Sequence, residues 1–180
     1  MFIKKLDLAV DLEQVKKDAN EIINQVGWGD FNQISLVHRP STLNQSERWR
    51  DGIGSLFADG KRLFHERDFV IVNNQVPIYI KKILNDLAAS QNIKIGRVRL
   101  MNLPYNQGLG VHYDESVRYH LAITTHNRAY IGESNLTEPS AVCYHIPANG
   151  HFYQVDTTKP HFVFNAANIP RIHLVICPIN

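Results

Sequence analysis

The stretch Val111-His112-Tyr113-Asp114 joins an extended-strand pattern to two side chains of types that bind metals. Residues two apart on a strand point to the same face, so His112 and Asp114 would present an imidazole nitrogen and a carboxylate oxygen to one point. His161, at the start of the apolar run His161-Phe-Val-Phe, would supply a second imidazole from a neighbouring strand. Two histidines and one carboxylate predict a metal site that keeps one open face.

This stretch is one of about eight short extended runs in the second half of the chain. From Lys94 onward the hydrophobic period is two, and Pro, Gly and Asn separate the runs. Many short strands following two helices predict a mainly β fold, a double-sheet jelly roll with N-terminal helices braced against one face. The expected strands are 94–103, 111–114, 118–125, 128–131, 141–146, 151–155, 161–165 and 171–177.

The first half supplies the helices. Asp11 is expected to cap a helix with a regular apolar stripe that ends at Gly27. Pro77 is expected to begin a second helix, which ends near Asn92. The other predictions for this half are short strands at 34–37 and 68–72 and a long polar loop at 38–60, either a lid or an inert connection.

Two turns carry predictions about strand pairing. Pro147-Ala-Asn-Gly150 lies between two extended runs, and Asn-Gly accepts the positive φ angles of a type I′ turn, which predicts a β-hairpin. Asn168-Ile-Pro170 joins the run with His161 to the run with Arg171. This strand, turn, strand pattern predicts that the two side chains lie near the same end of adjacent antiparallel strands.

Composition limits the broad class. A chain of 180 residues predicts one domain, with 1–93 as a helix-rich supporting region and 94–180 as the core with the site. A hydrophobic content of 44% and a net charge of +2 give no overall attraction to nucleic acid or membranes. Cys143 and Cys177 lie in apolar runs, which favours buried thiols over a disulfide. Without a signal-like segment or a long apolar run, a cytoplasmic protein is expected.

Arg171 predicts an anion-binding position beside the metal site. A guanidinium that points into a β-sandwich needs an anionic partner, and its planar fork suits a carboxylate. A dicarboxylate that binds the metal at one end and Arg171 at the other would explain both features. Arg118 and His120, two apart on one strand face, would assist. The alternative is that the arginines are strand-end residues that face solvent.

The second half resembles the aspartyl/asparaginyl β-hydroxylase family of Fe(II)- and 2-oxoglutarate-dependent dioxygenases, a group similar to some bacterial proline hydroxylases. The resemblance covers a little under half of the chain, in the family's order. Its segments are Val98-Arg-Leu-Met-Asn-Leu-Pro104, His112-Tyr-Asp114, Arg118-Tyr-His-Leu-Ala-Ile123, His161-Phe-Val-Phe-Asn165 and Arg171-Ile-His-Leu174.

The resemblance implies a cupin-like double-stranded β-helix. It also implies Fe(II) as the metal and 2-oxoglutarate and O2 as the co-substrates. Because Asp114 is present, a full ligand triad is favoured over a halogenase site. The family's Pro-Gly turn before the first histidine is replaced by Pro104-Tyr-Asn-Gln-Gly108. The implied roles are Fe(II) binding by His112, Asp114 and His161, and 2-oxoglutarate binding by Arg171 with help from Arg118 and His120.

The expected reaction is hydroxylation of an amino-acid side chain, free or in a peptide or protein, with aspartyl or asparaginyl residues as the first expectation. The alternatives are a free amino-acid hydroxylase of the proline type, a non-catalytic metal- or anion-binding jelly-roll module and a zinc hydrolase. Asn165 and His173 are candidates for holding the ligand imidazoles. Arg97 and Arg99 share a strand face and are candidates for a substrate carboxylate.

Overall fold

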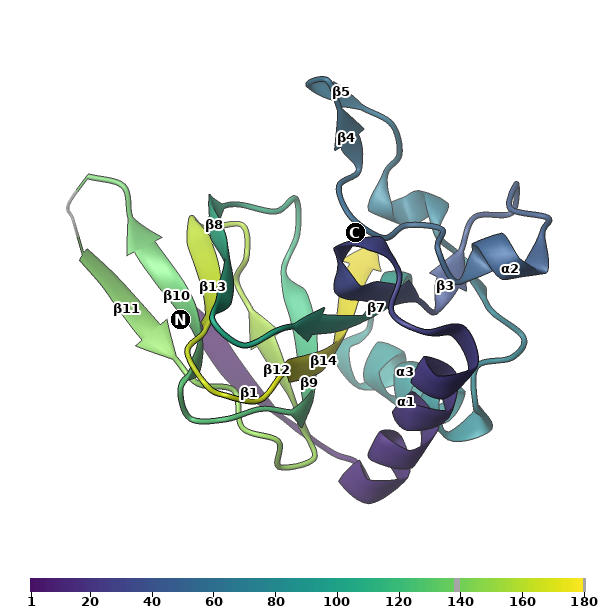
Figure 1. Cartoon of the computed structure of the whole chain (residues 1–180), viewed down its shortest axis with the longest axis horizontal. Coiled ribbons are helices and arrows are strands. Elements are labelled where there is room, and N and C mark those ends of the chain that lie inside the picture. Colours follow the sequence, from purple (N-terminus) through teal and green to yellow (C-terminus); the bar gives the residue numbers. More distant parts are fainter. Residues whose placement is uncertain (138–139, 180) are drawn as a thin grey trace.

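The computed structural model describes residues 1–137 and 140–179 and contains two large antiparallel sheets that face each other (Figure 1). Residues of both sheets, among them Ala122, Ile131 and Val163, form an apolar cluster between them. The predicted mainly β jelly roll is therefore confirmed. The six-stranded sheet consists, in order, of β1 (Ile3–Ala9), β12 (His151–Val155), β9 (Arg118–Thr124), β14 (Arg171–Ile179), β7 (Lys94–Leu103) and β2 (Gln33–Ser35), and the four-stranded sheet of β11 (Ser140–Tyr144), β10 (Ala129–Asn135), β13 (His161–Asn165) and β8 (Gln107–His112).

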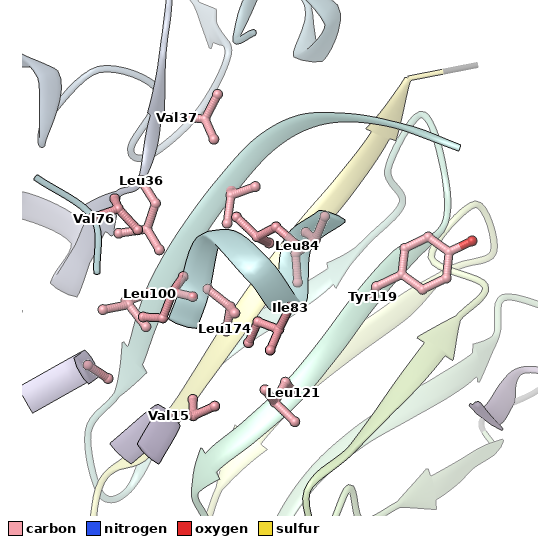
Figure 2. Packing of buried hydrophobic residues seen from close by; sticks show 14 of the residues in the cluster. Val15, Leu36, Val37, Val76, Ile83, Leu84, Leu100, Tyr119, Leu121 and Leu174 are labelled. Carbon is pink, nitrogen blue, oxygen red and sulfur yellow. The ribbon is translucent and has the colours of Figure 1, made fainter. Parts of the chain in front are cut away.

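Two helices cover the outer face of the six-stranded sheet, as the sequence predicts. The Asp11 carboxylate accepts two backbone N–H bonds at the start of α1 (Leu12–Val26), and Asn92 adopts the left-handed conformation after α3 (Ile78–Gln91). Their apolar stripes pack on alternate residues of the central strands. Figure 2 shows Val15, Ile83 and Leu84 of the helices in one cluster with Leu100, Leu121 and Leu174 of the sheet.

The strand alternation that buries these leucines under the helices places charged and polar side chains on the opposite face of the sheet. Arg99, His120 and His173 each neighbour one of the leucines in sequence and therefore point toward the four-stranded sheet. All three side chains are buried. The sheet is thus covered on both faces, with an apolar layer under the helices and, inside the jelly roll, cationic and polar side chains beside the apolar cluster.

Both predictions about strand pairing at turns are wrong. The chain at Pro147–Gly150 does not close a hairpin: β11 pairs with β10, whereas β12 pairs with β1 and β9 in the other sheet. Ile146 is buried between the sheets, so this segment crosses from one sheet to the other. Likewise, β13 and β14 belong to facing sheets rather than being adjacent strands, because the turn at Asn168–Pro170 also joins the two sheets.

The polar stretch predicted as a loop contains short elements and an anchor. Within 38–60 lie the end of β3 (Val37–His38), α2 (Gln45–Arg48) and β4 (Phe57–Ala58). The stretch is preceded by η1 (Asp30–Asn32) and followed by β5 (Lys61–Arg62), which forms a hairpin with β4, then η2 (Glu66–Asp68) and β6 (Ile71–Val72). The buried Asp51 carboxylate accepts hydrogen bonds from Arg39 and Thr42 and fixes the first part of the stretch.

The cysteine prediction holds in part. Both thiols are free, and Cys177 is buried, but Cys143 on β11 is exposed. In the described part of the chain, no helix is long and apolar enough to span a membrane.

Candidate metal and anion site

His112, Asp114 and His161 lie together at one end of the four-stranded sheet. His112 ends β8 and His161 begins β13, and the two residues are direct partners in the strand pairing. Asp114 lies just beyond β8, where its N–H donates to the Thr157 carbonyl. One ligand atom from each of the three side chains lies within 4.8 Å of the others. The proximity expected from the sequence is therefore present, although Asp114 is in a loop rather than on the strand.

Backbone carbonyls orient both imidazoles. Nδ1 of His112 lies 2.8 Å from the Gly110 carbonyl, and Nδ1 of His161 lies 2.9 Å from the Lys159 carbonyl. Since a carbonyl only accepts, each Nδ1 donates its N–H, and in the neutral tautomer with that proton the Nε2 lone pair is free. Burial also lowers the pKa of His161, which favours the neutral ring that a metal needs.

The carboxylate of Asp114 is held by a buried ion pair that the sequence did not predict. Arg118 Nη2 lies 3.2 Å from Asp114 Oδ1 and 2.6 Å from Glu66 Oε1. The other terminal nitrogen of Arg118 donates to Ser116 and to the Val117 carbonyl. Glu66 comes from η2, in a region without strand or helix periodicity, so no sequence signal marked it.

Arg171 is a buried cation that has no hydrogen bond or ion pair with the part of the chain that the structure describes. It begins β14 and is 6% exposed. Burial lowers the pKa of Arg171 to about 10, so the side chain remains positive at neutral pH. A buried guanidinium without a protein carboxylate is a site for an external anion.

His120 and His173 form a pair beside Arg171. Their Nδ1 atoms are 3.4 Å apart, and the Nε2 atom of each is buried without a partner in the described chain. Burial and then the Arg171 charge lower both pKa values well below 6.5, so both rings are neutral. A bond between two neutral rings needs one Nδ1–H and one bare Nδ1, so one Nε2 carries a proton. The pair therefore offers one N–H donor and one acceptor.

The remaining predicted residues lie as follows. Asn165 donates to the carbonyls of Leu103, Pro104 and Ile169, so in the described chain it fixes the end of β13 rather than a ligand imidazole. His173 contacts His120 rather than His112 or His161. The carbonyls that do orient the imidazoles are backbone atoms, which no side-chain pattern could reveal.

The residues fit a divalent metal and a dicarboxylate together. Two imidazole nitrogens and one carboxylate oxygen lie close enough together to bind one divalent metal, with Arg171 and one N–H of the histidine pair as donors nearby. The Nε2–H of the histidine pair and the unpaired guanidinium of Arg171 are the donors that a bound carboxylate would satisfy.

Comparisons with known proteins agree with this chemistry. A family model described as Aspartyl/Asparaginyl beta-hydroxylase matches residues 10–178. No curated protein matches the sequence.

Two solved structures of prolyl hydroxylases share the fold at low identity. A Pseudomonas putida prolyl-4-hydroxylase is 11% identical, with a TM-score of 0.53 over 98% of this chain and 91% of that one. A viral collagen prolyl hydroxylase from Paramecium bursaria Chlorella virus-1 is 10% identical, with a TM-score of 0.54 over 98% and 89%. An oxidoreductase of the 2OG-Fe(II) oxygenase family from Burkholderia pseudomallei is 17% identical, with a TM-score of 0.47; the alignment spans 59% of each chain.

Proposed function

The chain belongs to the aspartyl/asparaginyl β-hydroxylase family, and on this premise we propose that it uses Fe(II) and 2-oxoglutarate to hydroxylate an amino-acid side chain. The observation that carries the proposal is a set of two histidines and one aspartate within 4.8 Å, together with a buried arginine that has no protein partner in the described chain. Bound Fe(II), 2-oxoglutarate and O2 supply the C–H oxidation, with release of succinate and carbon dioxide.

His112, Asp114 and His161 are the proposed iron ligands. The Gly110 and Lys159 carbonyls keep the proton of each imidazole on Nδ1, so that Nε2 can bind the metal. Arg118 holds one oxygen of Asp114 and leaves the other free to coordinate. All three ligands are present, which argues against a non-catalytic module.

Arg171 is the proposed partner for the distal carboxylate of 2-oxoglutarate, with His120 as a neutral hydrogen-bonding group. Arg118 remains a predicted helper, but its terminal nitrogens already serve Glu66, Asp114 and Ser116. We therefore assign Arg118 mainly to positioning Asp114. The reaction of a zinc hydrolase does not require an anion at Arg171, whereas 2-oxoglutarate supplies a carboxylate for it, which favours the oxygenase.

The proposed substrate is an aspartyl or asparaginyl side chain of a peptide or protein, as the family's description suggests. The second candidate is a free amino acid of the proline type. Proteins described as prolyl hydroxylases, one of them a collagen prolyl hydroxylase, share the whole fold, which favours a prolyl group but does not favour its free form over a peptide-bound one.

The first experiment tests the oxygenase class. Metal-free protein under anaerobic conditions receives Fe(II) and 2-oxoglutarate, and the weak metal-to-ligand absorption band is followed, then succinate release in air. We expect a band that needs both additions and slow succinate formation. The Arg171→Ala variant should bind 2-oxoglutarate roughly 10-fold to 100-fold more weakly, because a charged hydrogen-bond partner is lost. Absence of both band and succinate would contradict the oxygenase assignment.

A further inference from the structure

Arg97 and Arg99 are two further buried cations on the inner face of β7. They are 4% and 6% exposed. Arg97 Nη2 donates to the Gly54 carbonyl at 3.1 Å, and Arg99 Nη1 donates to Gln33 Oε1 at 3.0 Å. The Nε atom of each arginine is buried without a partner in the described chain. Burial, and then the Arg99 charge, lower the pKa of Arg97 to about 9, so it is still a cation at pH 7.

The carboxylates nearby do not compensate these two charges. Glu66 and Asp114 are the acidic side chains that act on Arg99 in the described chain, and both are paired with Arg118. Asp114 is also a proposed metal ligand. Neither Arg97 nor Arg99 forms an ion pair with any described residue. Two buried guanidinium groups are therefore satisfied only by one neutral carbonyl and one amide, which is costly for a group of this charge.

The strand register separates these arginines from the 2-oxoglutarate end of the site. Arg171 is opposite Leu103 on β7, and the backbone of Arg99 lies four residues, or about 13 Å, along that strand from Leu103. Arg99 also lies across β14 from His120, since both are opposite Val175. A 2-oxoglutarate that binds the metal and Arg171 has no carboxylate left for Arg99. These two cations therefore remain without an anionic partner when 2-oxoglutarate is bound.

The backbone at Gly54 is hydrogen-bonded to Arg97 directly and to Arg99 through Gln33. Its carbonyl accepts from Arg97, and its N–H donates to Gln33 Oε1, the atom that also accepts from Arg99. Gly54 is only partly buried, so this end of the inner face is close to the surface.

We propose that Arg97 and Arg99 bind a carboxylate of the substrate, so that the enzyme acts on a carboxylate-bearing amino-acid substrate. This inference rests on the proposed function and narrows it. The carboxylate is either the side chain of an aspartyl residue or the α-carboxylate of a free amino acid such as proline. An internal asparaginyl residue, which has neither, is not a substrate.

The test compares acids with their neutral amides. Anaerobic protein loaded with Fe(II) and 2-oxoglutarate is titrated with three pairs: L-proline and L-prolinamide, N-acetyl-L-aspartate α-amide and N-acetyl-L-asparagine amide, and acetate and acetamide. Binding is followed by the shift of the absorption band and by equilibrium dialysis. We expect at least one acid to bind roughly 10-fold to 100-fold more tightly than its amide. A preference in the proline pair or in the aspartate pair identifies the source of the carboxylate, and the acetate pair measures the effect of the carboxylate group alone.

Variants assign the preference to the arginines. Arg99→Gln should remove it while 2-oxoglutarate still binds with unchanged affinity, and Arg99→Lys, which keeps the charge, should retain part of it. Arg128→Gln, a change at an exposed arginine, is the matched control and should behave like wild type. If Arg99→Gln does not fold, Arg97→Gln and Arg99→Lys decide the question by the same comparison.

Three results would overturn the inference: no acid preference in any pair, a preference that survives in Arg99→Gln and Arg97→Gln, or an Arg99→Gln variant that weakens 2-oxoglutarate as much as Arg171→Ala does. Failure of the proposed function is distinguishable, because it removes the absorption band. The acid preference can still be measured by dialysis in that case.

Discussion

His161 combines the three properties expected of a metal ligand: burial, a fixed ring and a neutral charge. It is 2% exposed, and its Nδ1 donates to a backbone carbonyl. Replacing His161 with Ala should lower the affinity for Fe(II) or Mn(II) by more than about 100-fold, since loss even of a group that only orients a ligand costs 10-fold to 100-fold. Metal content after dialysis measures this. His126→Ala, at an exposed histidine, should keep its metal, and full retention of metal by His161→Ala would remove His161 from the site.

The buried pair of His120 and His173 predicts a pH effect on stability. Burial and the Arg171 charge hold both pKa values well below 6.5, so the unfolded chain binds more protons than the folded one in acid. Their contribution is complete above pH 6.5 and is lost as the pH falls below it. Each histidine should lower the free energy of unfolding by about 1 kcal/mol when the pH falls from 6.5 to 5.5.

Urea unfolding of metal-free protein at the two pH values measures this loss. The His173→Asn variant should lose about 1 kcal/mol less than wild type over the interval. His126→Asn is the control and should follow the wild-type pH dependence. An identical pH dependence for His173→Asn and wild type would contradict the assignment of a depressed pKa to His173.

At the residue scale, spacing could predict proximity but not hydrogen bonding. His112 and Asp114 are two apart, and the run after His161 is strongly apolar, so these three residues could be predicted as a group. Glu66 could not, because it reaches Arg118 from a 3-10 turn about fifty residues earlier. The ion pair exists only through the tertiary fold.

At the scale of elements, Asp51 is the anchor of the irregular segment before the β4–β5 hairpin. Its carboxylate accepts from the Arg39 backbone, the Arg39 side chain and the Thr42 hydroxyl. Burial raises the pKa of Asp51, but the hydrogen bonds from Arg39 and Thr42 outweigh this effect and lower it. Asp51→Ala should therefore destabilise the protein by roughly 2–3 kcal/mol, because it leaves buried donors unpaired.

Urea denaturation measures this change. The matched control is Asp86→Ala, which removes an exposed i,i+4 pair with Lys82 on α3 and should change the midpoint little. Equal effects of the two substitutions would show that the Asp51 network does not hold the segment.

The elements that the sequence predicted best are those with a strong local pattern. β7, β12 and β13 have the predicted bounds, and α1 begins and ends where its caps indicated. The Asn-Gly signal at Pro147–Gly150 failed because a turn sequence describes a local bend and not which strands then pair. β1 was missed because its charged residues obscure the alternation of an edge strand, which pairs with β12.

At the scale of the whole molecule, the jelly roll encloses more positive than negative groups. Arg97, Arg99 and Arg171 have no carboxylate partner in the described chain, and the proposed metal adds further positive charge. Such a protein is less stable in the ligand-free state and becomes more stable when anions bind, because each bound anion pairs with a buried cation that otherwise has no partner. Ligands should therefore stabilise the protein according to the carboxylates that they carry.

This idea predicts a difference between 2-oxoglutarate and 2-oxobutyrate, which has the same 2-oxo acid end but no distal carboxylate. With Mn(II) present, 2-oxoglutarate at about 100 times its dissociation constant should raise the free energy of unfolding by about 2.7 kcal/mol. At the same concentration 2-oxobutyrate should raise it much less, because Arg171 stays unpaired. Thermal unfolding measures both effects. In Arg171→Ala the two ligands should stabilise the protein equally, and equal stabilisation of the wild type would mean that Arg171 does not receive the distal carboxylate.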